Sequence, residues 1–159
     1  DTLYGQNGHD LLDGEGNDDE LIGGGGNDTV WGGDGHDILY GNTGQDSLDG
    51  GNGNDELYGG DDDDTLEGGS GNNRLFGDDG NDKLYSDGGD DYISGGAGSD
   101  TIRPGDGRNT LEGGLGADYI YSGNDDDLLY GNEGDDELLS YGGKDTIYGG
   151  DGNDIIYYA

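Results

Sequence analysis

The residues best suited to chemistry in this sequence are aspartates that return at every ninth position. From Asp1 to Asp154, each step of nine residues lands on Asp, except at Asn73 and Asn109. A glycine-rich stretch precedes these positions, as in GGGGND over residues 23–28 and GGDGHD over residues 32–37. Carboxylate and backbone carbonyl oxygens are the ligands that a hard cation prefers. The spacing therefore indicates a cation site repeated along the chain.

Catalysis by paired carboxylates is the enzymatic alternative, because Asp and Glu are abundant. A general acid needs a desolvated pocket, whereas these carboxylates are expected in loops or on outward faces. The H-E-x-x-H motif of zinc proteases does not occur, and the repeat itself accounts for every G-x-G-x-x-G match. We therefore predict that the segment is not an enzyme and binds no nucleotide.

The composition is that of an acidic, weakly apolar chain. Among 159 residues there are 41 glycines, 39 acidic and 5 basic side chains, and the formal charge is −34. Leu, Ile, Val and Phe together make up about 16%, a level at which highly charged chains are disordered. This charge argues against nucleic acid and anionic membranes as partners. Without cysteine there are no disulfides or thiolate metal sites, and no apolar run is long enough to insert into a membrane.

A second series overrules the prediction of disorder. Steps of nine residues from Leu3 to Ile156 always land on a branched aliphatic residue, and no insertion or deletion breaks the register. A disordered polyacid has no reason to keep such a phase. We therefore expect residues 1–159 to fold as a single repeat domain. We also expect this domain to be a fragment of a longer chain that supplies the missing end caps.

The unit G-G-x-G-x-D-x-U-x, in which U is the aliphatic residue, resembles the RTX (repeats-in-toxin, hemolysin-type) calcium-binding nonapeptide repeat. The resemblance covers essentially the whole chain. It implies an all-β parallel β-roll, a right-handed β-solenoid, in which six residues turn and hold Ca²⁺ and three form a short strand. It also implies a bacterial protein that leaves the cell unfolded by type I secretion and folds outside, where calcium is millimolar. The parent would be a toxin, protease, lipase, epimerase or adhesin.

The residues support this architecture independently. Side chains alternate along a strand, so the aliphatic residue two positions after each Asp faces inward and its neighbours face outward. Two units of nine make one coil of about 18 residues, and alternate units form two sheets that share a thin core. Burying one aliphatic side chain per unit gains less free energy than ordering nine residues costs. We therefore predict that the chain is unfolded without calcium and folds on binding it, with each ion between loops one coil apart.

Sorting the loops by edge gives two series. One runs from Asp10 to Asp154 in steps of eighteen and the other from Asp19 to Asp145, so roughly fifteen Ca²⁺ ions fit between successive loops. The predicted metal ligands are Asp10, Asp19, Asp28, Asp37, Asp46, Asp55, Asp64, Asp82, Asp91, Asp100, Asp118, Asp127, Asp136, Asp145 and Asp154. The second series loses its opening glycine in its later loops and carries both Asn substitutions. We expect weaker or missing ions around Asn73 and from Asn109 onward.

Outward-facing side chains at equivalent positions of successive coils form columns, and these columns leave further interpretations open. Tyr4, Tyr40, Tyr58 and Phe76 share one column, which predicts either a structural ladder of stacked rings or a glycan contact. A rigid spacer or glycan-contacting repeat of a calcium-dependent adhesin is therefore the alternative function. Towards the C-terminus these columns become apolar, which predicts a capping segment or self-association there. The regular register would also suit an idealised repeat without a biological partner. His9 and His36 are interpreted as exposed spacers.

Overall fold

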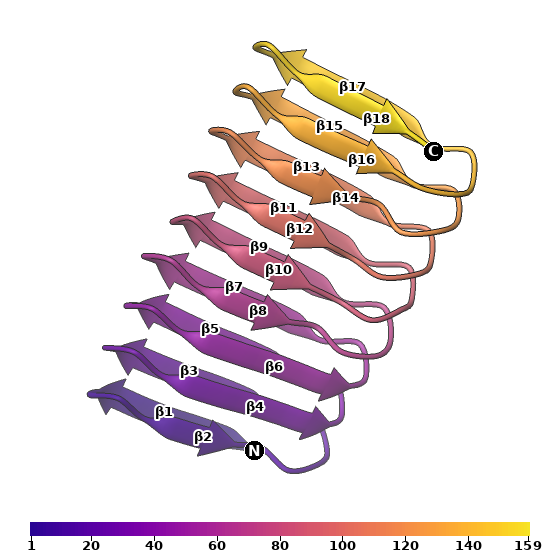
Figure 1. Cartoon of the computed structure of the whole chain (residues 1–159). Coiled ribbons are helices and arrows are strands. Elements are labelled where there is room, and N and C mark those ends of the chain that lie inside the picture. Colours follow the sequence, from indigo (N-terminus) through magenta and orange to yellow (C-terminus); the bar gives the residue numbers. More distant parts are fainter.

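The computed structural model describes all of residues 1–159 as a stack of flattened coils (Figure 1). It contains eighteen strands and no helix, and the strands form two sheets of nine. Every strand pair within each sheet is parallel, as in β1 with β3 and β2 with β4. The predicted all-β parallel β-roll is confirmed. No helix in the structure is long and apolar enough to cross a membrane.

The first sheet contains the odd-numbered strands, and each of them has six residues. They are β1 (Thr2–Asn7), β3 (Glu20–Gly25), β5 (Ile38–Thr43), β7 (Glu56–Asp61), β9 (Arg74–Asp79), β11 (Tyr92–Ala97), β13 (Thr110–Leu115), β15 (Leu128–Glu133) and β17 (Thr146–Asp151).

The second sheet contains the even-numbered strands, and their lengths vary. They are β2 (Leu11–Asp13), β4 (Thr29–Asp34), β6 (Ser47–Asn52), β8 (Thr65–Glu67), β10 (Lys83–Tyr85), β12 (Thr101–Arg103), β14 (Tyr119–Tyr121), β16 (Glu137–Ser140) and β18 (Ile155–Tyr158).

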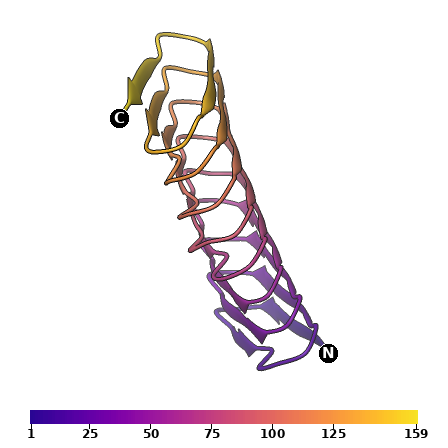
Figure 2. The ribbon, with the colours of Figure 1, turned by 90° about the vertical axis from the view of Figure 1, so that its right-hand side faces the viewer.

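The register between neighbouring strands is constant. Leu39 pairs with Leu57 in the first sheet, and Leu48 pairs with Leu66 in the second, a step of eighteen residues in each case. The predicted coil length is therefore confirmed. Figure 2 shows the resulting rod, which has the N-terminus at one end and the C-terminus at the other.

The core is a single file of aliphatic side chains between the two sheets. Fifteen of them are buried, and each belongs to the series that starts at Leu3. They are Leu12, Leu21, Val30, Leu39, Leu48, Leu57, Leu66, Leu75, Leu84, Ile93, Ile102, Leu111, Ile120, Leu129 and Leu138. Leu3 and Ile147 pack against this cluster while partly buried, whereas Ile156 in the last strand is 49% exposed. The predicted inward face is confirmed, and it is uncovered at the end of the roll.

Many strands are longer than the three residues that the repeat predicts. The strands of the first sheet, together with β4 and β6, continue into the first three positions of the following loop. The second and third of these positions pair with the same positions one coil further on, as Gly24 does with Asn42 and Gly25 with Thr43. The second loop position requires a positive φ, which is 114° at Gly24 and 76° at Asn42. A constant coil length, rather than β-propensity, creates this pairing.

The last coil has the most exposed apolar surface. Ile155, Tyr157 and Tyr158 are at least half exposed. Tyr119 and Tyr121 in an earlier coil are only partly exposed. A capping segment or self-association at this end stays a prediction.

Candidate metal sites

All fifteen predicted aspartate ligands lie at the two edges where one sheet passes into the other. We call the edge that carries Asp10, Asp28 and every eighteenth residue up to Asp154 the Asp10 edge. The opposite edge, which carries the series from Asp19 to Asp145, is the Asp19 edge. Twelve of the fifteen aspartates are buried, and Asp10, Asp145 and Asp154, near the ends of the roll, are partly exposed.

One carboxylate oxygen of each internal aspartate is used by the backbone. The main-chain N–H of Asp46 donates to Oδ1 of Asp64 at 2.7 Å, and the N–H of Asp64 donates to Oδ1 of Asp82 at the same distance. The Asp19 edge repeats this pattern, with the N–H of Asp19 bound to Oδ1 of Asp37 at 2.8 Å. These bonds fix the orientation of each carboxylate relative to the next coil. They also leave Oδ2 free for another partner.

The second carboxylate oxygen is buried without a hydrogen-bond partner in thirteen of the fifteen predicted ligands. These are Asp10, Asp19, Asp28, Asp37, Asp46, Asp55, Asp64, Asp82, Asp91, Asp100, Asp118, Asp127 and Asp136. A buried polar oxygen without a partner is costly, and more so when it carries charge. Thirteen such atoms in two rows indicate a missing positive partner along each row.

A glycine five positions before the aspartate opens the space in front of this oxygen. A Cβ placed on Gly14 would stand 2.7 Å from Oδ2 of Asp19 and 2.6 Å from the carbonyl oxygen of Gly32, one coil further on. Real Cβ atoms do not approach oxygens so closely, so no side chain fits here. The carboxylate and the next coil's carbonyl therefore converge on one small space, which we call a glycine cradle.

Cradles of this kind are numerous but unequally distributed. On the Asp10 edge, a glycine stands before Oδ2 at every loop. These glycines are Gly5, Gly23, Gly41, Gly59, Gly77, Gly95, Gly113, Gly131 and Gly149, of which all but the last have a following loop. On the Asp19 edge, only Gly14, Gly32 and Gly50 face a carboxylate oxygen in this way, because Gly68 faces the amide nitrogen of Asn73 instead.

The donor set fits calcium better than a transition metal. No group of three or more His, Asp or Glu side chains is arranged so that these side chains alone could hold a metal ion. An ion at a cradle would therefore depend on carboxylate oxygens from successive loops and on main-chain carbonyl oxygens. Ca²⁺ accepts six to eight such oxygens in flexible geometry, whereas Zn²⁺ favours nitrogen and sulfur ligands.

Burial changes the acidity of these carboxyls. Burial, with a smaller contribution from neighbouring aspartates, raises the pKa of Asp64 to about 8 and that of Asp100 to about 7. The backbone hydrogen bond from Asp46 lowers the pKa of Asp64, and the one from Asp82 lowers the pKa of Asp100, but neither offsets the effect of burial. Burial likewise raises the pKa of Asp55 to about 6. Without a bound cation, Asp64 and Asp100 thus resist ionisation near neutral pH.

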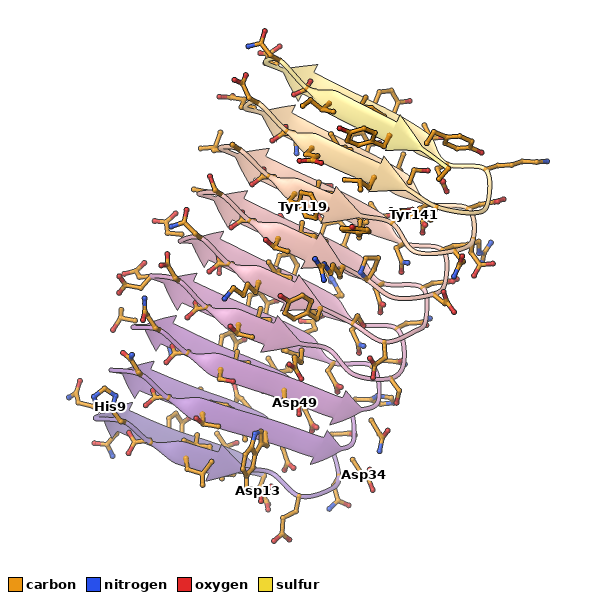
Figure 3. All side chains as sticks on the ribbon, viewed as in Figure 1. His9, Asp13, Asp34, Asp49, Tyr119 and Tyr141 are labelled. Carbon is orange, nitrogen blue, oxygen red and sulfur yellow. The ribbon has the colours of Figure 1, made fainter.

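The residues just before the aspartates form a second ladder that the sequence did not reveal. The N–H of Asn27 donates to Nδ1 of His9 at 2.9 Å, and the N–H of Asn54 donates to Nδ1 of His36 at 2.9 Å. Figure 3 labels His9 in a loop at the edge of the first coils. This ladder runs in the opposite direction to the Asp ladder, because here each side chain accepts from the following coil. Both histidines are exposed as predicted, but each also fixes the position of a neighbouring loop.

The aromatic column of the first sheet forms a stack. The ring of Tyr58 lies 5.0 Å from that of Tyr40 and 4.9 Å from that of Phe76, with interplanar angles of 11° and 8°. Because the ring faces cover one another, mainly ring edges remain available to solvent. A glycan stacks on ring faces, so this arrangement favours the structural ladder.

Comparison with known proteins agrees with this geometry. The model of the RTX calcium-binding nonapeptide repeat (4 copies) matches residues 1–30, 31–66, 67–102, 104–138 and 130–159. The matches include every residue except 103, next to Pro104 in the most divergent loop. A search of curated proteins gives no match.

Proposed function

This chain belongs to the family of RTX calcium-binding nonapeptide repeats, and from that membership we propose that it is a module that folds when it binds several Ca²⁺ ions outside the cell. In this proposal it forms part of a secreted bacterial RTX-type protein and has no catalytic role of its own. The proposed ligands are the edge aspartates together with loop carbonyl oxygens.

The observation that carries this proposal is the row of buried Oδ2 atoms without partners. Each row places carboxylates of like charge at successive coils in a largely buried setting, which opposes folding when no cation is present. Bound calcium supplies the positive charge that both rows need. Because the cradles exist only between stacked coils, binding free energy becomes folding free energy.

The composition supports export before folding. The metal-free chain has a formal charge of −34 and a thin core, so it stays extended where calcium is scarce. Extracellular calcium modules bind in the range of roughly 10⁻⁴ to 10⁻³ M, which matches folding after release from the cell. The lack of cysteine is compatible with this route, because folding then needs no disulfide formation.

Small-angle X-ray scattering tests the coupling of binding to folding. In excess chelator we expect a radius of gyration of about 40 Å, as for an unfolded chain of this length, and about 15 Å in millimolar calcium. A compact particle in chelator would refute the proposal. Magnesium at the same concentration should leave the chain expanded, because Mg²⁺ demands rigid octahedral geometry and keeps its water.

A further inference from the structure

The two edges of the roll do not carry the same residue in front of the aspartate. On the Asp10 edge this position is glycine in all nine loops. On the Asp19 edge it is glycine only up to Gly68, and the four later loops have Ser86, Pro104, Ser122 and Ser140. In these four loops a side chain therefore occupies the position at which glycine leaves open space in the other loops.

Hydrogen-bond donors face the oxygens in this part of the Asp19 edge. The hydroxyl of Ser140 donates to Oδ2 of Asp145, the atom that is unpartnered in thirteen other loops. The amide nitrogen of Asn73 donates to the carbonyl oxygen of Gly69 and to the hydroxyl oxygen of Ser86, both at 3.3 Å. A donor hydrogen in a cradle repels a cation and satisfies the oxygen that the cation would need.

Asp91 and Asp127 keep an unpartnered Oδ2, and a serine lies five positions before each of them. The hydroxyl of Ser86 donates to the carbonyl oxygen of Gly69, and that of Ser122 donates to the carbonyl oxygen of Gly123, both at 3.3 Å. In each case a serine hydroxyl thus binds a loop carbonyl oxygen that an ion could otherwise use. It stands at the position where the other edge has a glycine.

The backbone of these loops also departs from the pattern. The strands β4 and β6 run on into the Asp19 edge, whereas β8, β10, β12 and β14, like β2 in the first coil, stop after three residues. Figure 1 shows the difference in arrow length. Gly33 and Gly51 have positive φ values of 106° and 94° at the second loop position, and Gly105 and Gly123 keep this conformation at 77° and 91°, whereas Asp87 and Tyr141 do not have a positive φ there. The backbone of the two loops that end at Asp91 and Asp145 therefore differs from that of the complete cradles.

We propose that calcium binds along the whole Asp10 edge but only beside Asp19, Asp37 and Asp55 on the Asp19 edge. The rest of the Asp19 edge is closed by serine hydroxyls and asparagine amides in place of ions. This inference rests on the proposed function, and it removes Asp91, Asp127 and Asp145 from the expected ligands. With eight cradles on one edge and three on the other, each followed by a further loop, the chain holds about eleven ions rather than fifteen.

This arrangement gives the roll a polarity. Its N-terminal coils are held by ions at both edges, and its C-terminal coils are held by ions at one edge and by hydrogen bonds at the other. The Asp19 edge beyond Asn73 is then the part of the fold whose contacts do not depend on calcium.

Anomalous scattering from crystals grown with calcium, or with terbium as its substitute, locates the ions directly. We expect peaks beside Asp10 to Asp136 on the Asp10 edge and beside Asp19, Asp37 and Asp55. Peaks beside Asp91 or Asp127 would overturn the inference while leaving the proposed function intact. Peaks on neither edge would overturn the proposed function itself.

Two matched variants test the same point in solution. Asp118→Asn and Asp127→Asn change buried aspartates in consecutive loops, and in each case the amide oxygen can still accept the backbone N–H that Oδ1 accepts now, from Asp100 and Asn109 respectively. We expect native mass spectrometry to show the loss of about one ion from Asp118→Asn and no loss from Asp127→Asn. Equal losses from both variants would contradict the inference. Should Asp127→Asn fail to fold, the ion positions in crystals of the unchanged chain still decide.

Discussion

The main-chain N–H of Asp10 donates a hydrogen bond to Oδ1 of Asp28, one coil further along, at 2.8 Å. The same bond recurs at both edges, for example from Asp82 to Asp100 and from Asp19 to Asp37. The two oxygens of each carboxylate therefore have different roles. Oδ1 accepts the bond that holds neighbouring coils in register, and Oδ2 faces the cradle. An Asp→Asn change therefore preserves the register bond and removes the charge.

The glycine cradle is tested by adding one methyl group. A Cβ on Gly95 would stand 2.6 Å from the carbonyl oxygen of Gly113 and against Oδ2 of Asp100. We expect Gly95→Ala to lose one ion and to raise the calcium concentration at the folding midpoint several-fold. Gly88→Ala is the control, because its Cβ would meet nothing nearer than an oxygen at 3.5 Å and its φ is not positive. If the two variants have the same midpoint, the cradle does not shape the site.

The dependence on pH follows from the raised pKa values. Burial raises the pKa of Asp64 to about 8 and that of Asp100 to about 7, against about 4 in the unfolded chain. The folded, metal-free chain therefore binds more protons than the unfolded chain, and its stability falls as pH rises from about 4 to about 8. In chelator, circular dichroism should accordingly show more β structure at about pH 5 than at about pH 8.

Calcium and protons compete for the same carboxylate oxygens. Low pH should therefore stabilise the metal-free fold but weaken calcium-dependent folding. Lowering the pH from about 8 to about 5 should raise the calcium concentration needed for folding. A midpoint that is constant over this range would show that the buried carboxylates are not ligands.

The aliphatic core is tested by Leu84→Ala. Leu84 is fully buried in the file between the two sheets. Truncating a buried leucine costs about 2–5 kcal/mol, and we expect the loss to appear as a higher calcium midpoint because folding and binding are coupled. Leu115→Ala removes the same atoms from a side chain that is 52% exposed and should leave the midpoint nearly unchanged. Equal effects of the two changes would mean that the file of leucines adds little to stability.

The aromatic column is tested by Tyr58→Ala. This change removes two stacked contacts, with Tyr40 and with Phe76, each worth about 0.5–1.5 kcal/mol beyond area burial. Tyr4→Ala is the control, since Tyr4 is 64% exposed at the first coil. We expect only Tyr58→Ala to shift the calcium midpoint. If Tyr58→Ala folds normally but abolishes binding to a glycan array, the adhesin interpretation replaces the structural one.

The sequence predicted the fold because two strict periods constrain it. Leu48 and Leu66 face the same core because no residue is inserted between them and the coil length is constant. The position of the aspartates at the edges follows from the same period. The length of β5 did not follow, because Gly41 and Asn42 have low strand propensity and Asn42 pairs with Gly24 only through the repeat register.

Details of the candidate sites needed three-dimensional geometry. The loss of glycine at positions 86, 122 and 140 is visible in the sequence, but the hydrogen bond from Ser140 to Asp145 is not. The different roles of Oδ1 and Oδ2 likewise depend on the orientation of each carboxylate, which the sequence does not specify. His9 gave no sequence signal for its ladder, because Asn, Asp and Ser occupy the same loop position elsewhere and accept the same bond.

The most direct measurement of the central claim is far-UV circular dichroism during a calcium titration, with magnesium as the control. We expect a disordered spectrum in excess chelator and a steep, cooperative change to β structure at roughly 10⁻⁴ to 10⁻³ M calcium, with no such change in magnesium. A β spectrum already present in chelator at neutral pH would contradict the account, because the stacked leucines, isoleucines and tyrosines would then suffice to fold the chain without an ion.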